Sequence, residues 1–204
     1  AAQAAGILSL DQAAALIVAR SRHQHATRGT GRMAAIGATP EAIAPLLEES
    51  GPGLEIAAIN APAALTIAGP AAAIARLCQA AEAARLLAIP LDLDYAFHSA
   101  AMDPVRTGLL RDLAGMDTQP GTCTMISSVT GKPLPGAEAR AEYWWRNLRE
   151  PVHFQHAVAE AARQGARLFL EIGPAPVLQN YLRETLRAEA VEGAILSSLK
   201  RQDP

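Results

Sequence analysis

Histidine is the side chain best suited to acid–base chemistry near neutral pH, and of the five histidines here His98 stands apart. It lies in the stretch YAFHSAAMDP (residues 95–104), between an expected strand ending at Asp94 and an expected helix running to about Leu113. Proteins with parallel sheets place catalytic groups at the carboxyl ends of strands. His98 is therefore a candidate general base, although the residues alone favour a buried or capping histidine at least as well.

The other histidines and the cysteines do not suggest a metal site. His23 and His25 follow a predicted helix, and we expect them to be solvated at its C-terminal end. His153 and His156 have the i, i+3 spacing of half a metal site, but no second pair of ligands accompanies them, so a helix surface is favoured. The two cysteines, Cys78 and Cys123, lack a CxxC spacing. No metal is predicted.

Charge and hydropathy exclude several classes of protein. The net charge of −2 disfavours a nucleic-acid binder. The stretch TRGTGR (residues 27–32) lacks the glycine spacing of a phosphate loop. No uncharged apolar run approaches the ~18 residues of a membrane helix, and no basic leader precedes an apolar stretch. The prediction is a soluble, cytoplasmic α/β protein with a mainly aliphatic core.

The elements that must position His98 follow from hydrophobic periodicity. Apolar residues at helical spacing predict a first helix over Leu10–Arg22, with residues 1–8 as the tail of an earlier helix. Residues 32–93 have the order β-α-β-β-α-β of a ferredoxin-like unit. Thereafter, strands expected at 124–127, 168–172 and 194–199 alternate with helices, which predicts a parallel sheet covered by helices.

Several stretches together are similar to a known family. Residues 94–104 resemble the histidine motif of the acyltransferase domains of modular type I polyketide synthases, which are relatives of malonyl-CoA:ACP transacylase. Four further stretches agree in order and spacing: AGILSLDQAAALIVARSR (5–22), AAINAPAALTIAG (57–69), YWWRNLREPVHFQHAV (143–158) and LFLEIGPAPVL (168–178). The resemblance covers essentially the whole chain.

The resemblance implies a fold and an arrangement of regions. The expected fold is an α/β-hydrolase-like parallel-sheet body, present in part, with an inserted ferredoxin-like subdomain. Residues 1–31 and 94–199 would belong to the large subdomain, residues 32–93 to the small one, and residues 200–204 to the start of a linker.

The resemblance also implies roles for individual residues. His98 corresponds to the base that takes a proton from a serine hydroxyl. Asn147 corresponds to the position whose main chain holds that imidazole in the right tautomer. Arg20 corresponds to the arginine that binds the free carboxylate of the extender unit, and a planar guanidinium suits that bidentate contact better than lysine does.

The family's nucleophile motif, GHSxGE, does not occur in this sequence. The spacing of the matching helix would place its serine about six residues before Ala1, and the glutamine segment of the family's oxyanion hole is also missing. Ser99 adjoins His98, but adjacent side chains rarely reach nucleophile–base geometry. The chain therefore resembles the C-terminal two-thirds of such a domain and is expected to be inactive alone.

The residues before the histidine track the extender unit in this family, where HAFH accompanies malonyl and YASH accompanies methylmalonyl. Here Tyr95-Ala96-Phe97-His98 is a hybrid. The ring of Phe97 should fill the space that a 2-methyl branch needs, and the following Met-Asp-Pro also resembles the malonyl type. Malonyl is therefore favoured over methylmalonyl.

The resemblance implies transfer of the extender unit from CoA to the phosphopantetheine thiol of an acyl carrier protein through an acyl-serine. CoA thioesters would be substrates and no cofactor would be bound. The carrier protein, the ketosynthase and other synthase domains would be partners. The alternatives are a stand-alone fatty-acid transacylase and a non-catalytic structural or carrier-docking fragment. An acyl hydrolase would lack an arginine at position 20, so Arg20 disfavours it.

Overall fold

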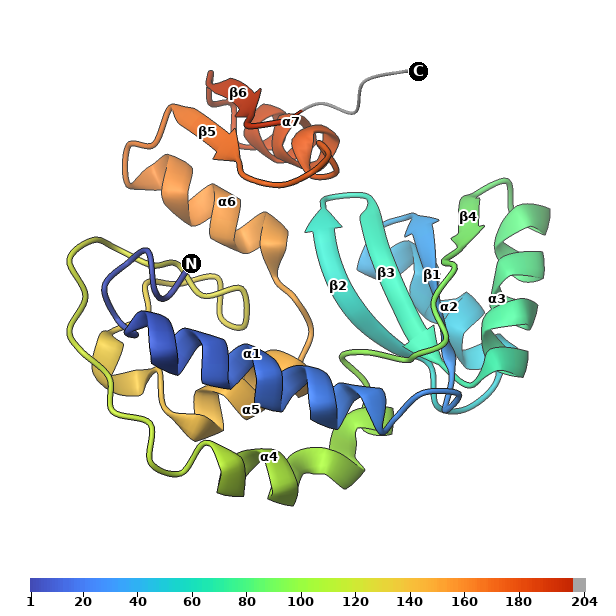
Figure 1. The fold of residues 1–204 in the computed structure, drawn as a ribbon. Helices are drawn as coiled ribbons and strands as arrows, with labels where there is room; N and C mark the ends of the chain where they lie inside the picture. Colours follow the sequence, from blue (N-terminus) through green and yellow to red (C-terminus); the bar gives the residue numbers. More distant parts are fainter. Residues whose placement is uncertain (200–204) are drawn as a thin grey trace.

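A computed structural model describes residues 1–199 and shows a four-stranded antiparallel sheet beside a layer of helices (Figure 1). The sheet is formed by β1 (Arg32–Gly37), β2 (Glu55–Ala61), β3 (Ala64–Gly69) and β4 (Leu87–Pro90), in the spatial order β2-β3-β1-β4. Helices α2 (Pro40–Ser50) and α3 (Ala71–Ala83) complete the predicted β-α-β-β-α-β order. The α/β fold class is confirmed.

The two faces of this sheet have different neighbours. Alternate residues of β1 and β3, among them Ile36 and Ile67, pack with Ile43 of α2 and Leu77 of α3 in an aliphatic core. On the opposite face Met33, Ala57 and Ala68 pack against Ala96, which lies two residues before His98. The sheet thus carries the segment that contains the candidate base.

The helical layer forms a second core. Helix α1 (Leu10–His25) begins with a capping box between Ser9 and Gln12, and it packs near α4 (Arg106–Asp112) and α5 (Ala141–Arg149) (Figure 1). Two 3₁₀ helices, η1 (Ala100–Val105) and η2 (Gly136–Glu138), lie in the connections. Met102 of η1 and Leu148 of α5 are both fully buried in this core, so η1 and the end of α5 have fixed places beside His98.

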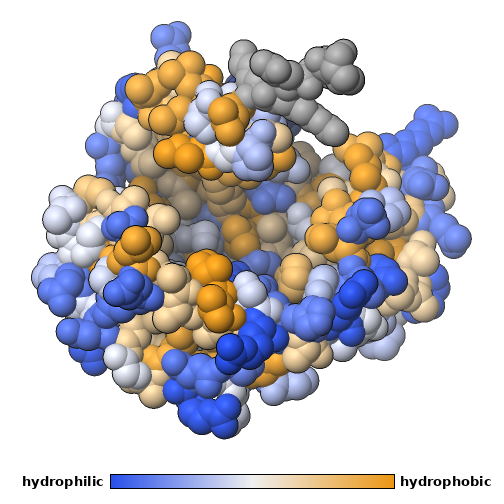
Figure 2. Space-filling model, viewed as in Figure 1, coloured by the Kyte–Doolittle hydropathy of each residue, from blue (hydrophilic) through white to orange (hydrophobic). Residues whose placement is uncertain are grey.

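The C-terminal elements are α6 (Phe154–Arg163), β5 (Leu168–Glu171), α7 (Gln179–Ala188) and β6 (Ala194–Ser197). Strands β5 and β6 pair in parallel, as predicted, and among residues 1–199 they form the whole of the parallel sheet. Leu168, Leu170 and Leu196 are each more than half exposed, and Figure 2 shows hydrophobic residues gathered over this part of the surface.

Two expected elements are wrong. Residues 2–8 form turns rather than the tail of a helix. Residues 124–127 form no strand: only Ile126 makes an isolated bridge, to Pro133. The Ser127 hydroxyl accepts from the backbone N–H groups of Val129 and Thr130 (3.0 and 3.3 Å), which closes a tight turn where the strand would continue.

The predicted linker, residues 200–204, lies outside the described residues. The division of the preceding chain into residues 1–31, 32–93 and 94–199 stays a prediction. Within residues 1–199, no helix combines the length and apolar character that crossing a bilayer requires.

Candidate active site

The imidazole of His98 is held by a main-chain carbonyl. Its Nδ1 lies 2.9 Å from the carbonyl oxygen of Glu150. Because a carbonyl oxygen can only accept, Nδ1 must carry the proton, and this leaves the lone pair of the neutral ring on Nε2. His98 also has a φ of 57°, in the left-handed region that non-glycine residues seldom occupy. The neighbouring Ala96 packing and the Ser99 cap hold that strained backbone.

Ser99 is a capping residue. Its hydroxyl donates to the carbonyl of Ala96 (2.7 Å) and accepts from the N–H of Ala101 (3.3 Å), at the start of η1. The residue is only 2% exposed. Both hydrogen-bonding functions of the hydroxyl are used within the backbone, which agrees with the expectation that Ser99 does not replace the nucleophile.

Burial keeps His98 neutral. Desolvation lowers the pKa of His98 to about 4; the Glu150 carbonyl opposes the shift, and the positive charge of Arg20 adds to it. The side chain is therefore unprotonated at neutral pH and can accept a proton at Nε2.

The lowered pKa predicts that acid destabilises the protein. Between pH 6.5 and about 4 the unfolded chain protonates His98 while the folded chain does not, so stability falls as the pH falls through this window. For His98 the loss is about 3 kcal/mol at most. Urea unfolding of the wild-type chain and of His98→Gln at pH 7 and pH 4.5 measures it. The wild type should lose more than the variant, and equal losses would contradict a buried neutral His98.

Arg20 and Asn147 meet beside the histidine. The guanidinium of Arg20, on α1, donates to Oδ1 of Asn147 on α5, and Nδ2 of Asn147 donates to the Ser128 hydroxyl (3.3 Å). Burial lowers the pKa of Arg20, with Tyr143 opposing the shift. Even so, a guanidinium stays protonated in proteins, and it therefore offers a cation beside His98.

The expected role of Asn147 needs correction. The structure places Asn147 on Arg20, and the imidazole contacts Glu150 instead. The reason is the end of α5: the helix stops at Arg149, and Glu150 takes extended angles (φ −82°, ψ 159°) that free its carbonyl from the helical ladder. Asn147 lies inside the helix, where its main-chain carbonyl does not reach the imidazole. Its side chain instead accepts the hydrogen bond of Arg20.

Tyr95 and Phe97, which precede His98 in the chain, form one unit. Their rings stack at 4.7 Å between centroids with an interplanar angle of 13°. The Tyr95 hydroxyl lies 3.5 Å from Nδ1 of His25 at the end of α1. Phe97 also packs against buried residues of both the sheet face and the helical layer. The place of the Phe97 ring is therefore set from several sides.

His23, His153 and His156 lie outside this arrangement. His23, expected to be solvated, pairs through Nε2 with Asp112 of α4 (2.8 Å) and is only 16% exposed. His153 and His156 stack at 5.3 Å between ring centroids. Burial, followed by the charge of His156, lowers the pKa of His153. Among residues 1–199, no group of three or more His, Cys, Asp or Glu side chains could hold a metal.

Sequence reasoning identified His98 and Arg20, which the structure brings together, but it missed Glu150. Glu150 acts through its main chain, so its residue type gives no signal. Its place in the stretch LREPV, directly before a proline that disfavours a helical conformation, was the available clue.

Comparisons with known proteins show the family of the chain. The acyl transferase domain model matches residues 1–204. The chain is 38% identical over 202 residues to polyketide synthase GfsB of Streptomyces halstedii, covering 98% of this chain and 4% of that protein. It is 33% identical over 204 residues to erythronolide synthase EryA2 of Saccharopolyspora erythraea, covering 100% of this chain and 6% of that protein.

A solved structure gives the same picture. The acyltransferase domain from module 8 of the salinomycin polyketide synthase matches with a TM-score of 0.94 and 30% identity, over 98% of this chain and 48% of that one. The chain thus spans about half of that solved chain and a small part of each curated relative. It belongs to the acyl transferase domain family.

Proposed function

We propose that this chain is the substrate-selecting and base-bearing part of an acyltransferase that moves a malonyl extender unit from CoA to a carrier-protein thiol. The observation that carries the proposal is a neutral His98, with its Nδ1 proton held by the Glu150 carbonyl, beside the positive charge of Arg20. This combination offers a base and a carboxylate-binding cation together. The cation favours transfer of an acyl group that has a free carboxylate. Hydrolysis of a neutral ester would not need it.

Two half-reactions follow from this arrangement. In the first, Nε2 of His98 takes the proton of a serine hydroxyl as its oxygen attacks the thioester carbonyl. The C–S bond breaks, and the CoA sulfur takes the proton from the imidazolium. In the second, His98 takes the proton of the phosphopantetheine thiol, whose sulfur attacks the acyl-serine ester. The serine oxygen leaves and recovers its proton from His98. Arg20 holds the extender carboxylate throughout.

The serine is proposed to come from a GHSxGE segment outside this sequence. No serine in the sequence has a GxSxG context, and Ser99 is occupied as a cap. We therefore propose that the chain alone does not form an acyl-enzyme. The carrier protein, the ketosynthase and neighbouring synthase domains are the proposed partners, and the cytoplasm, where CoA thioesters occur, is the proposed location. A free-standing transacylase and a non-catalytic docking fragment are the alternatives.

The extender preference is proposed to be set by Phe97. Its ring is held by the Tyr95 stack and by core contacts, so it cannot easily turn away to admit a 2-methyl branch. Joining this chain to the GHSxGE segment of a related acyltransferase gives what we call the complemented domain. Incubated with equal malonyl-CoA and methylmalonyl-CoA, it should gain a malonyl adduct by intact-mass spectrometry. Phe97→Ser should raise the ratio of methylmalonyl to malonyl adduct about 10-fold.

The chain alone, treated in the same way, is the control and should show no adduct. An adduct on the chain alone would contradict the need for an external serine. An unchanged ratio in Phe97→Ser would remove Phe97 from the selection of the acyl group. A complemented domain that folds but takes up neither acyl group would favour the docking fragment.

A further inference from the structure

Arg149, the last residue of α5, joins three elements around the candidate active site. Its Nη1 donates to Oε2 of Glu55, the first residue of β2, at 2.9 Å. Its Nε donates to Oδ1 of Asp103 in η1 at 2.7 Å. The arginine side chain is only 24% exposed, and that of Glu55 is 33% exposed. We call Glu55, Arg149 and Asp103 the clasp.

The clasp reaches both partners of the His98 hydrogen bond. Arg149 directly precedes Glu150, whose carbonyl is the acceptor. On the donor side, the second oxygen of the Glu55 carboxylate accepts from the N–H of Ala100 (2.6 Å), which is two residues after His98. Asp103 holds the following turn of η1 to the same guanidinium. One carboxylate and one guanidinium therefore fix the chain on each side of the imidazole.

The backbone after Glu150 is fixed to the same strand. Val152 donates to the carbonyl of Ala57 (2.9 Å) and accepts from the N–H of Ile59 (2.8 Å). It thereby forms a parallel bridge with Ala58 at the free edge of β2. Glu150 thus lies between two attachments to β2: the Arg149–Glu55 ion pair before it and the Val152 bridge after it. The antiparallel sheet is linked to the position of the Glu150 carbonyl.

We propose that Arg149 is a positioning residue that, through Glu55 and Asp103, keeps the Glu150 carbonyl on Nδ1–H of His98 and so selects the tautomer with a free Nε2. The catalytic meaning of this tautomer rests on the proposed function, but the tautomer itself can be measured without any acyl transfer. Hydrogen bonds to charged groups are stronger than neutral ones, and the fork of a guanidinium can meet two carboxylates where a lysine offers a point charge.

The test is the ¹⁵N chemical shifts of the His98 ring in this chain at pH 7.5, where the side chain is neutral. The wild-type chain should show protonated Nδ1 and unprotonated Nε2. Arg149→Met should lose this single form and give a mixture with the Nε2–H form, because the segment that carries the carbonyl then loses one of its two attachments to β2. Arg149→Lys should lie between the two, since it keeps the charge but cannot bind both carboxylates.

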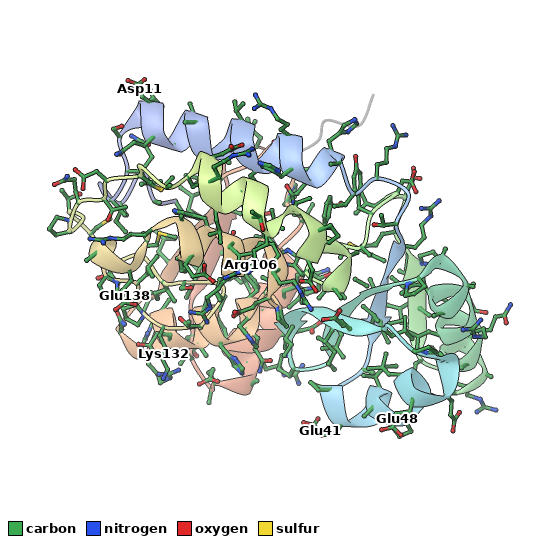
Figure 3. All side chains as sticks on the ribbon, turned by 90° about the horizontal axis from the view of Figure 1, so that it is seen from below. Asp11, Glu41, Glu48, Arg106, Lys132 and Glu138 are labelled. Carbon is green, nitrogen blue, oxygen red and sulfur yellow. The ribbon has the colours of Figure 1, made fainter. Side chains whose placement is uncertain are left out.

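The matched control is Arg106→Met. Arg106 of α4 (labelled in Figure 3) also makes an ion pair with a carboxylate of α5, Glu142 at 3.1 Å, but at the opposite end of that helix from Glu150. Removing it should leave the His98 shifts unchanged. If Arg149→Met keeps Nδ1 as the only protonated nitrogen, the proposal is overturned. This holds even if the midpoint of thermal unfolding of the variant falls, because a purely structural role predicts lower stability alone.

A second variant keeps the test decisive if Arg149→Met does not fold. Glu55→Gln removes one of the two charge partners of Arg149 but keeps an oxygen for the Ala100 N–H. It should shift the tautomer mixture in the same direction, and an unchanged single tautomer in it would overturn the proposal. The complemented domain could fail to transfer an acyl group while the His98 tautomer still depends on Arg149. That result would count against the proposed function and not against the role of the clasp.

Discussion

His98→Ala should lower the rate of serine acylation in the complemented domain by about 10³-fold, within the range that general acid–base catalysis supplies. Without the imidazole, no group in the described site accepts the serine proton, since the Nδ1 partner is a carbonyl and the neighbouring Ser99 is a cap. Single-turnover loading from malonyl-CoA, followed by intact mass, measures the change. The KM for malonyl-CoA should change little, because Arg20 still binds the carboxylate.

The wild-type pH profile gives this prediction a second readout. Because burial lowers the pKa of His98 to about 4, acylation should stay nearly constant from pH 8 down to about 5.5. An inflection near 6.5 would mean that the imidazole is solvated when it acts. Retention of the acylation rate within tenfold in His98→Ala would remove His98 from the proton transfer.

Elements with strong local patterns could be predicted from the sequence. Apolar residues at helical spacing predicted the helix that begins at Leu10, and the order of apolar segments predicted the β-α-β-β-α-β unit. The expected strand at 124–127 fails because a strand needs a neighbour to pair with, and local composition does not supply one. Ser127 instead closes a turn.

The site was predictable only where function depends on side-chain type. His98 and Arg20 could be singled out because the stretches that contain them resemble motifs of a known family. Imidazole and guanidinium have few substitutes in the roles that this resemblance implies. The carbonyl of Glu150 could not, since every residue has one. The pairing of Arg149 with Glu55 joins residues 94 positions apart in the sequence, and such a contact depends on how β2 and α5 lie in the fold. The swap of Asn147 from His98 to Arg20 is of the same kind.

Arg20→Ala should lower the efficiency of malonyl loading by the complemented domain about 100-fold, while loading from acetyl-CoA, which has no free carboxylate, changes little. The loss corresponds to about 3 kcal/mol, the value of a strong charged hydrogen bond. Arg20→Lys should recover part of the efficiency, because it restores the charge without the bidentate fork. Arg22→Ala is the matched control, since Arg22 lies on the same helix and is exposed.

Arg20 has two expected effects, on the pKa of His98 and on binding of the extender carboxylate, and the pH dependence of loading separates them. Its positive charge lowers the pKa of His98, so Arg20→Ala should move the acid limb of the acylation profile to higher pH for both acyl groups. The loss specific to malonyl measured at pH 8, where His98 is neutral in either case, then reports carboxylate binding alone. Equal losses for malonyl-CoA and acetyl-CoA at that pH would show that Arg20 supports the fold through Asn147 and does not bind the substrate.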